Sequence, residues 1–593
     1  PDSEEDVGGR LKRNPDQIGL TQEELEPFRD QPFWRRLRCC LFVSFWLLWL
    51  LLFLLALLIL FLSPKCSVKL RPSWWQSAVA YHVWLPSFAD GDGDGMGDVN
   101  GLVGRLDQLR KAGVHSLWPR PFLLTDEFSD AVRDFRALDS KLGVNTDAKK
   151  LIDAAHSRGM KMIIDFPIAT TSLEHYWFLR SQPPRSPENK DFGEFYVWRK
   201  PPANSSFFSS PPSAKGDQSV YLHKENQPKS AVLNWQSGRL RMQIFEALSE
   251  WIDRGIDGFH LTGIDYLARS ADFSEPNWKE IVDLIADIRN HVTTYANETA
   301  TPEVVVFASM EDAKEKDKRK LVSNLHLNSL INYELTRIEK NSKICHKNEG
   351  SVGTCVYEIL SDLLLFHSLN EDVPPHWELG NSLVPRLASR VGSRLHAELL
   401  LMLQLLLPGT NSVYYGDEIG MRNLPNDSKV EVQRGAMQWD DSPGGGFSSI
   451  PSPLIPLSRD YKNVNWERQY SENQSPLKTF LKLSKLRQRE EVLVTGKTLM
   501  GNLVDRSAFT MARFIRSQNV TTGNIFVIGV NFSSKLSQIP LDLLPSQSTL
   551  SKAEVVAVSS NTVHLAPRDS LFFKDNLLEL PPDHGILFKY PSA

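Results

Sequence analysis

Four aspartates at alternate positions form a candidate cation-binding loop between residues 90 and 98. Asp90, Asp92, Asp94 and Asp98 each bring a carboxylate, and the main-chain carbonyl of Met96 fills the remaining alternate position. Hard oxygen ligands of this kind suit Ca²⁺, and the intervening glycines allow the backbone to wrap tightly. The loop is not an EF-hand, because its twelfth position is not a glutamate. The sequence therefore predicts a structural Ca²⁺ site, with a solvated acidic turn as the alternative.

Cys66 is a candidate for a disulfide to another chain. Cys345 and Cys355 enclose a short loop and are predicted to pair with each other in an oxidising compartment. Cys39 and Cys40 lie before a long apolar run, where S-palmitoylation and two reduced thiols are both open interpretations. Cys66 follows the run by three residues and is then the odd cysteine on its side. An odd extracellular cysteine indicates a partner chain or a free thiol.

Acceptor sites for N-glycosylation all lie after the same apolar run. Single Asn-x-Ser/Thr sequences arise often by chance, so only their distribution carries weight. The six sites are Asn204, Asn297, Asn426, Asn473, Asn519 and Asn531. This distribution predicts that the C-terminal part of the chain lies outside the cell.

The apolar run itself, residues 41–63, predicts a transmembrane helix. It contains no charge, and about 20 apolar residues cover the ~30 Å hydrocarbon core. A cleaved signal peptide has a shorter apolar core and a small-residue cleavage site. Arg35, Arg36 and Arg38 directly precede the run, so the positive-inside rule predicts a cytosolic N-terminus and a single-pass type II topology.

The polar segments on either side of the run predict a tail and a linker. Residues 1–40 are rich in charge and proline and are expected to be disordered, apart from a short helix at 21–29. Residues 64–77 form a juxtamembrane linker. The net charge of −4, without a basic stripe, gives no indication of nucleic-acid binding.

Residues 78–490 are predicted to form a (β/α)8 TIM barrel, because strand-like and helix-like segments alternate many times. The expected strands include 78–88, 114–119, 160–165, 257–261, 302–309 and 412–415, and the expected helices include 102–112, 147–159, 239–255 and 396–408. Residues 172–233 break the alternation and predict an inserted, B-domain-like segment.

Residues 491–593 are predicted to form a C-terminal antiparallel β-sandwich, because short strands replace the alternating pattern. A helix at 477–489 comes before them. The expected strands are 509–515, 524–531, 554–558, 562–565 and 586–590.

Five motifs in this order resemble the α-amylase family of glycoside hydrolases, and within it the oligo-1,6-glucosidase type. They read VAYHVWLPSFADGDGDGMGDVNGL, KMIIDF, GIDGFHL, PGTNSVYYGDEIGM and AMQWDDS. The resemblance covers nearly all of the chain after the apolar run. It implies an α/β (β/α)8 barrel, a B domain inserted after the third strand and a C-terminal β-sandwich. In glucosidase-type members the matching acidic loop binds calcium.

The resemblance also locates the family's catalytic positions, and none of them holds a carboxylate here. A retaining glycosidase acts with two carboxyl groups ~5–5.5 Å apart. Thr262 stands at the nucleophile position, Met310 at that of the general acid and Leu383 at that of the transition-state stabiliser. A threonine hydroxyl without a paired base does not form the glycosyl ester, and methionine has no proton to give. The resemblance therefore implies a protein that is not an enzyme.

Positions near these three also lack the residues that the family has there. His260 replaces the arginine that accompanies the nucleophile, and Ala169 and Thr170 stand where an Asn-His pair follows the third strand, although Asp165 is retained. Glu311 is adjacent to position 310. Because side chains alternate along a strand, a shift of one residue is expected to aim it away from the pocket.

The tail and Cys66 resemble a further group, the heavy chains of heteromeric amino-acid transporters. The string GLTQEELEPFRDQPFWRRLRCCLFVSFWLLWL is similar to the ubiquitous cell-surface-antigen type, whereas the insertion and the acidic loop look more like the renal type. In both types, the cysteine that matches Cys66 forms a disulfide to a multi-spanning light chain. The resemblance implies a catalytically inactive ancillary subunit that stabilises the light chain and brings it to the plasma membrane, in contact with membrane lipid.

Two functions from other classes are alternatives. One is a membrane-tethered α-glucosidase that uses displaced carboxylates such as Glu311 and Asp257. The other is a homodimeric adhesion or receptor glycoprotein in which Cys66 pairs with its own copy.

Overall fold

The described part of the N-terminal unit, residues 22–62, is almost entirely helical in the computed structural model. The structure describes residues 22–62, 72–201, 204, 206–212, 219–309, 327–340, 351–369, 374–517, 520–542, 545 and 550–592. The chain divides into two units at residues 71 and 72. The first contains α1 (Gln22–Arg29) and α2 (Pro32–Leu62).

Helix α2 is longer than the predicted transmembrane segment. It begins at Pro32, so residues 32–40 are helical, and the prediction of a disordered tail up to residue 40 is wrong there. The physical reason is that proline suits the first helical position and arginine is a good helix former, so nothing ends the helix before the charged segment. The described helix Pro32–Ile59 is long and apolar enough to cross a membrane.

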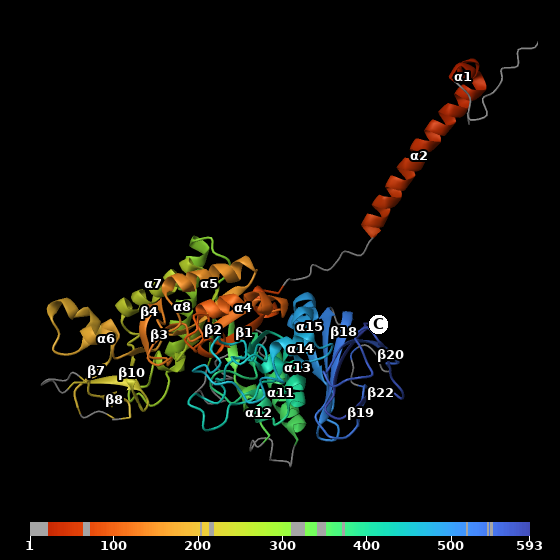
Figure 1. Cartoon of the computed structure of the whole chain (residues 1–593). Coiled ribbons are helices and arrows are strands. Elements are labelled where there is room, and N and C mark those ends of the chain that lie inside the picture. The colour runs from red at the N-terminus through yellow and green to blue at the C-terminus, as the bar shows by residue number, and fades with distance from the viewer. Residues whose placement is uncertain are drawn as a thin grey trace, which may run out of the picture. The chain divides into compact units, whose positions relative to one another are not determined.

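The second unit is built on a closed barrel of eight parallel strands, which confirms the predicted fold (Figure 1). Around the barrel the order is β1, β15, β14, β13, β12, β11, β5 and β2. Each barrel strand therefore lies next to the barrel strand that comes before or after it in the sequence, and β15, the last, closes against β1. Their bounds are β1 (Val79–Trp84), β2 (Ser116–Arg120), β5 (Lys161–Pro167), β11 (Gly258–Thr262), β12 (Val305–Ser309), β13 (Ser329–Asn332), β14 (Pro375–Glu378) and β15 (Thr410–Tyr414).

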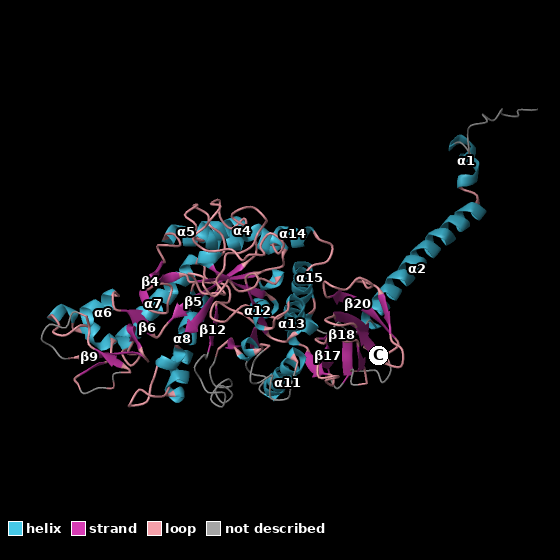
Figure 2. Cartoon of the chain, turned by 60° about the horizontal axis from the view of Figure 1, so that its bottom comes forward, coloured by secondary structure: helices cyan, strands magenta, loops and turns pink. Residues whose placement is uncertain are grey.

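Amphipathic helices cover the outside of this barrel (Figure 2). They are α4 (Val99–Lys111), α5 (Asn145–Ser157), α7 (Gly238–Arg254), α8 (Trp278–Glu298), α11 (Val352–Leu369), α13 (Arg394–Leu406) and α15 (Pro476–Arg489), with short helices α12 (Leu387–Arg390), α14 (Trp466–Ser471) and α16 (Glu491–Thr495). Helix α11 is also long and apolar enough to cross a membrane. Its buried face, however, packs into the same core as the barrel.

Rings fill the inside of the barrel. Trp118 of β2 stacks on His82 of β1 with centroids 4.4 Å apart, and it meets Phe307 of β12 edge-on at 5.3 Å. Phe307 lies 5.2 Å from His376 of β14. The interior is therefore a packed core, as in other barrels of this kind.

A tryptophan pair covers the amino end of the barrel. The short helix α3 (Trp74–Ser77) places Trp74 and Trp75 against the core residues at that end. The indole N–H of Trp74 donates to the main-chain carbonyl of Glu303, and that of Trp75 donates to the Glu303 carboxylate, both at 3.2 Å. Buried Arg487 of α15 donates to the carbonyl of Gln76 at 3.2 Å. These bonds tie the beginning of the second unit to the barrel.

The inserted segment shares a sheet with an earlier part of the chain. The sheet has the order β3, β4, β6, β10, β9, β7, with β8 paired to β9. Its strands are β3 (Leu123–Thr125), β4 (Val132–Leu138), β6 (Thr170–Ser172), β7 (Trp198–Arg199), β8 (Phe208–Ser209), β9 (Val220–Lys224) and β10 (Gln227–Val232). The hairpin β3–β4 follows the second barrel strand, so the inserted residues alone do not make this layer.

The C-terminal part contains a six-stranded antiparallel sheet and a two-stranded sheet that enclose one apolar core. The strands are β16 (Lys497–Met500), β17 (Ala508–Ser517), β18 (Val520–Asn531), β19 (Ser537–Pro540), β20 (Lys552–Val558), β21 (Ser570–Phe572), β22 (Leu577–Leu580) and β23 (Gly585–Pro591). The strand predicted at 562–565 is wrong, because those residues are irregular and pair with no described strand, and β21 and β22 lie further along. In Figure 1 these strands lie at the opposite end of the unit from β7–β10.

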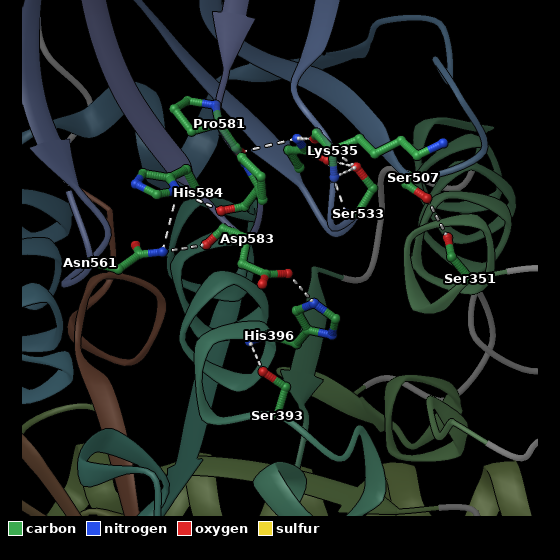
Figure 3. Close-up of polar contacts among 12 residues, drawn as sticks. Ser351, Ser393, His396, Ser507, Ser533, Lys535, Asn561, Pro581, Asp583 and His584 are labelled. Carbon is green, nitrogen blue, oxygen red and sulfur yellow. Dashed lines mark hydrogen bonds and ion pairs between the residues drawn. The ribbon is translucent and has the colours of Figure 1, made fainter.

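Polar contacts join the C-terminal sheets to the barrel. The imidazole Nε2 of His396 in α13 lies 2.8 Å from the Asp583 carboxylate, in the turn before β23, and the two side chains point toward one another (Figure 3). On the same side, buried Glu398 accepts hydrogen bonds from the hydroxyls of Thr479 and Ser560.

Candidate functional site

The carboxyl end of strand β11 is where a barrel glycosidase of this family would carry its nucleophile, and it ends in Thr262. The residue is buried, and its hydroxyl has no hydrogen-bond partner among the described residues. No described imidazole or carboxylate therefore acts as the base that a hydroxyl nucleophile requires.

Asp165, the retained aspartate of strand β5, is held by three donors. The indole N–H of Trp118 donates to it at 2.7 Å, the Nδ1 of His260 lies at 2.9 Å, and the Nε of Arg120 lies at 2.9 Å. Burial by itself raises the pKa of Asp165, but the charge of Arg120 and the contact with His260 outweigh it and hold the pKa well below its ordinary value. Asp165 is an ionised structural centre in the barrel.

His260 extends this network to strand β12. Its Nε2 lies 3.1 Å from the Ser309 hydroxyl, while its Nδ1 faces Asp165. The ring therefore lies between the Asp165 carboxylate and the Ser309 hydroxyl, with one nitrogen facing each. Both ring nitrogens of His260 therefore have partners inside the barrel wall. His260 forms no hydrogen bond with the Thr262 hydroxyl.

Glu378, at the end of strand β14, is a buried carboxyl that the sequence interpretation missed. It accepts hydrogen bonds from the Asn381 side-chain amide at 2.6 Å and from the Ser412 hydroxyl at 2.9 Å. Burial raises its pKa to about 7, against the lowering effect of those two donors. The signal that would have found it is its position as the last residue of a barrel strand.

Two more carboxyls follow strand β15 and are buried as well. The Tyr81 hydroxyl donates to Glu418 at 2.8 Å, and Arg386 lies 3.8 Å from Asp417. Burial raises the pKa of Asp417 to about 6 and that of Glu418 to about 7. These groups therefore lie inside the protein rather than facing solvent.

The structure describes only some of the other predicted catalytic positions. Leu383 is 45% exposed, and only its backbone N–H is bonded, to the Asn381 side chain at 2.9 Å. Met310 and Glu311 lie outside the described residues. Ala169 and Thr170 are buried, and the Thr170 hydroxyl donates to the Asp130 carbonyl. Asp257 lies at the amino end of β11, where His156 and Lys161 bind it at 2.7 Å, so it is remote from the catalytic end.

A cavity of about 870 Å³ opens on the inserted sheet. Its lining includes Asp126, Arg133, Glu174, Leu179 and Lys229. The Nη1 of Arg133 lies 2.9 Å from the Glu174 carboxylate, and its Nε contacts Asp126. The lining includes neither Thr262 nor Asp165, so this cavity is separate from the position of the family's nucleophile.

The acidic loop brings three of its four aspartates together. Carboxylate oxygens of Asp90, Asp92 and Asp98 lie within 4.8 Å of one another. Asp90 also accepts from the backbone N–H groups of residues 93 and 95 and from a serine hydroxyl, and Asp98 caps helix α4. The predicted ligand Asp94 is not in this group, and it accepts from the Met96 N–H at 2.7 Å. The main-chain carbonyl of Met96 stays a predicted ligand.

The electrostatics of the loop fit a cation. The Asp94 N–H lowers the pKa of Asp92, but desolvation and the charges of Asp94, Asp98 and Asp90 outweigh it, and the pKa is raised. Asp90, Asp92 and Asp98 would therefore be the residues that hold Ca²⁺, which would supply the missing positive charge.

The cysteines are only partly described. Cys355, buried at the beginning of α11, is disulfide-bonded, while Cys66 and Cys345 lie outside the described residues. Cys39 and Cys40 are free and exposed on α2. The predicted Cys345–Cys355 pair and the partner disulfide of Cys66 stay predictions.

Four of the predicted glycosylation sites are exposed, and one is ruled out. Asn204, Asn297, Asn426 and Asn473 are exposed, and Asn519 lies outside the described residues. Asn531 is fully buried, and its side-chain amide donates to three carbonyls, those of Lys535, Leu580 and Pro581. The prediction that Asn531 carries a glycan is wrong for the folded protein, because the amide nitrogen has no room for the sugar.

The comparisons with known proteins agree with this architecture. Residues 82–496 match the family model of the α-amylase catalytic domain, so the chain belongs to the α-amylase family. The structure is similar to the crystal structure of Bacillus licheniformis trehalose-6-phosphate hydrolase, with a TM-score of 0.73 and 20% identity over 88% of this chain and all of that one. This likeness concerns the fold.

Other relatives are similar along nearly the whole chain and are of a more particular kind. Residues 9–81 match the model of the solute carrier family 3 member 2 N-terminus. The amino acid transporter heavy chain SLC3A1 of Mus musculus is 28% identical over 93% of this chain and 85% of its own length, and that of Homo sapiens is 27% identical over 95% and 86%. An α-glucosidase of Culex pipiens is 28% identical over 70% of this chain. The chain thus combines an α-amylase-family barrel with the N-terminal region of a transporter heavy chain.

Proposed function

We propose that the chain is the ancillary heavy chain of a heteromeric amino-acid transporter and that its barrel does not hydrolyse glycosides. The observation that carries the proposal is Thr262, a buried residue without a base at the end of strand β11, where a glycosidase of this family needs a carboxylate. Similarity to heavy chains along 93% of the chain supports it.

In this proposal the working parts are the membrane helix and Cys66. Helix α2 crosses the plasma membrane once, with the tail in the cytosol and the barrel outside, because Arg35, Arg36 and Arg38 precede its apolar part. Cys66 forms the disulfide to a multi-spanning light chain, and contacts within the bilayer hold the two chains together. The heavy chain stabilises the light chain and brings it to the cell surface.

Cys66→Ser is expected to abolish the covalent heterodimer. On a non-reducing gel of cell membranes, the wild-type chain should run at the summed mass of heavy and light chains and the variant at the mass of the monomer. Cys39→Ser is the matched control and should leave the larger band unchanged, because that thiol lies on the other side of the apolar helix. Mass spectrometry of the wild-type band identifies the partner.

Two results would contradict the proposal. A wild-type band at twice the monomer mass would indicate the homodimeric adhesion protein instead. Turnover of a maltose-like substrate by the purified chain, lost in Glu311→Gln, would indicate the tethered α-glucosidase.

We also propose that the loop of Asp90, Asp92 and Asp98 binds structural Ca²⁺. Saturating Ca²⁺ should then stabilise the fold by about 2.7 kcal/mol at a concentration of about 100 times Kd, read as an increase in Tm in differential scanning calorimetry. Asp92→Ala should remove the response, because the exposed Asp92 side chain contributes to the cluster without capping α4. Asp94→Asn, outside the cluster, should keep it. An equal Tm of the wild-type protein in Ca²⁺ and in chelator would refute the site.

A further inference from the structure

The depth of two cysteines in a membrane is determined by the length of helix α2. The helix is continuous from Pro32 to Leu62. Its apolar part after the two cysteines, residues 41–62, measures about 33 Å at about 1.5 Å per residue, close to the ~30 Å hydrocarbon core. Cys39 and Cys40 are the last residues before that part begins. In a membrane they therefore lie at the boundary between the acyl chains and the headgroups.

Arginines directly before the cysteines hold that depth. Arg35 and Arg36 precede Cys39 and Cys40 by four positions each, which is about one helical turn, or about 6 Å toward the tail. Guanidinium groups seek the headgroup layer and its phosphates. The Nε of Arg38 donates to the Trp34 carbonyl at 3.3 Å, and its guanidinium also reaches the Arg29 carbonyl, so it points away from the thiols. The thiols are left facing the acyl chains.

The two thiols are chemically available. Both cysteines are free and exposed on the helix. Successive residues on a helix lie about 100° apart around the axis, so the two side chains point to adjacent sectors of the same level. Acyl chains attached at both positions would enter the lipid side by side, without having to occupy the same groove on the helix.

We propose that Cys39 and Cys40 are both S-acylated with long-chain fatty acids at the cytosolic face of the membrane. The inference rests on the topology of the proposed function, because the acyl donor, a long-chain acyl-CoA, is cytosolic. In each transfer the thiolate sulfur attacks the acyl carbonyl, a new carbon–sulfur bond forms and the bond to coenzyme A breaks. The cysteine proton leaves to a base, and coenzyme A is released as its thiol, so nothing is oxidised or reduced.

The modification adds two lipid chains to a helix that is already anchored. The consequence is therefore local: the chains fill the bilayer around residues 39–44 and hold the helix at one depth and tilt on its cytosolic side. This position is separate from Cys66, which lies beyond the other end of the helix. The acyl groups and the partner disulfide accordingly act at opposite ends of α2.

The test is thioester exchange on the full-length chain in cells that also express its light chain. Free thiols are blocked, thioesters are cleaved with hydroxylamine, and the released thiols are labelled with a polyethylene-glycol maleimide that shifts the band on a gel. We expect two shifts for the wild-type chain, one for Cys39→Ser, one for Cys40→Ser and none for the double variant. Disulfides do not react with hydroxylamine, so Cys66 and Cys355 add no shift.

The outcomes separate this inference from the proposed function. A wild-type chain without hydroxylamine-dependent shifts overturns the inference, as do shifts that persist in the double variant. The same lysates are run on a non-reducing gel for the light-chain complex. A complex without hydroxylamine-dependent shifts refutes only the acylation, whereas shifts without a complex support the acylation and refute the proposed partner.

Discussion

Asp165→Asn is expected to lower the free energy of unfolding of the barrel by about 3–5 kcal/mol, the range found when one partner of a buried ion pair is removed. The carboxylate accepts from Trp118 and lies within 2.9 Å of both Arg120 and His260. The side chains of Arg120 and Asp165 are only 12% and 8% exposed, so water cannot replace the lost charge. The asparagine keeps the shape but removes the nearer carboxylate of the largely buried Arg120, whose other carboxylate contact, with Asp130, is longer at 3.7 Å.

The measurement is denaturant unfolding of the purified protein, followed by tryptophan fluorescence. Asp153→Asn is the matched control, because Asp153 pairs with Lys149 on the surface of α5 and both side chains are at least half exposed. It should change the free energy by less than about 0.5 kcal/mol. If Asp165→Asn also lowered the free energy of unfolding by less than about 0.5 kcal/mol, the contacts of Asp165 with Trp118, Arg120 and His260 would not stabilise the barrel.

Glu378→Gln is expected to stabilise the protein at about pH 8 and to have little effect at about pH 5. Burial raises the pKa of the glutamate to about 7 in the folded state; in the unfolded chain it is about 4.3. Between these values the folded protein holds a proton that the unfolded chain has released. The contribution of Glu378 to stability is therefore full below about pH 4.3 and is lost as the pH rises through about 7. Glutamine exchanges no proton, so the variant should gain on the order of 3 kcal/mol at about pH 8.

Buried histidines act in the opposite direction, so the comparison has to be made between variant and wild type at each pH. Burial lowers the pKa of His82 and of His376 to about 3. Their contributions are present above about pH 6.5, the ordinary pKa of histidine, and are lost as the pH falls. Glu298→Gln, at an exposed position in α8, is the control and should follow the wild-type curve. If wild type and Glu378→Gln lost the same free energy of unfolding between about pH 5 and about pH 8, the raised pKa of Glu378 in the folded protein would be contradicted.

The order of the elements was largely predictable because hydrophobic periodicity is local. Six barrel strands and the helices at 102–112, 147–159, 239–255 and 396–408 were predicted close to their observed bounds, and the apolar helix was recognised from composition. Helices α8 and α11 were not predicted. Strands β13 and β14 were missed by pattern, because each has four residues with polar members among them, and only packing against neighbouring strands makes them strands. Likewise, residues 562–565 have the composition of a strand but no neighbour with which to pair.

For the candidate sites, motifs predicted the positions of residues along the strands but not the contacts of their side chains. The motif placed Thr262 at the end of the fourth barrel strand, where it lies in the structure. The motifs could not show that Leu383 is exposed or that Asp94 lies outside the acidic cluster. Nor could they show that the side-chain amide of Asn531 donates hydrogen bonds to three carbonyls. Each of these depends on residues that are distant in the chain or on the direction of a single side chain.

By itself, the sequence determined that this protein has an apolar helix long enough to cross a membrane and an α-amylase-type barrel. These features follow from residue types and their spacing, whereas the absence of carboxylates at three catalytic positions is a prediction from the resemblance to that family. Only the tertiary structure decided what replaced the site: Asp165 pairs with Arg120 and contacts His260 through a hydrogen bond, and Glu378 is buried between Asn381 and Ser412. The physical reason is that charge, burial and hydrogen bonding depend on which strands lie side by side in the closed barrel.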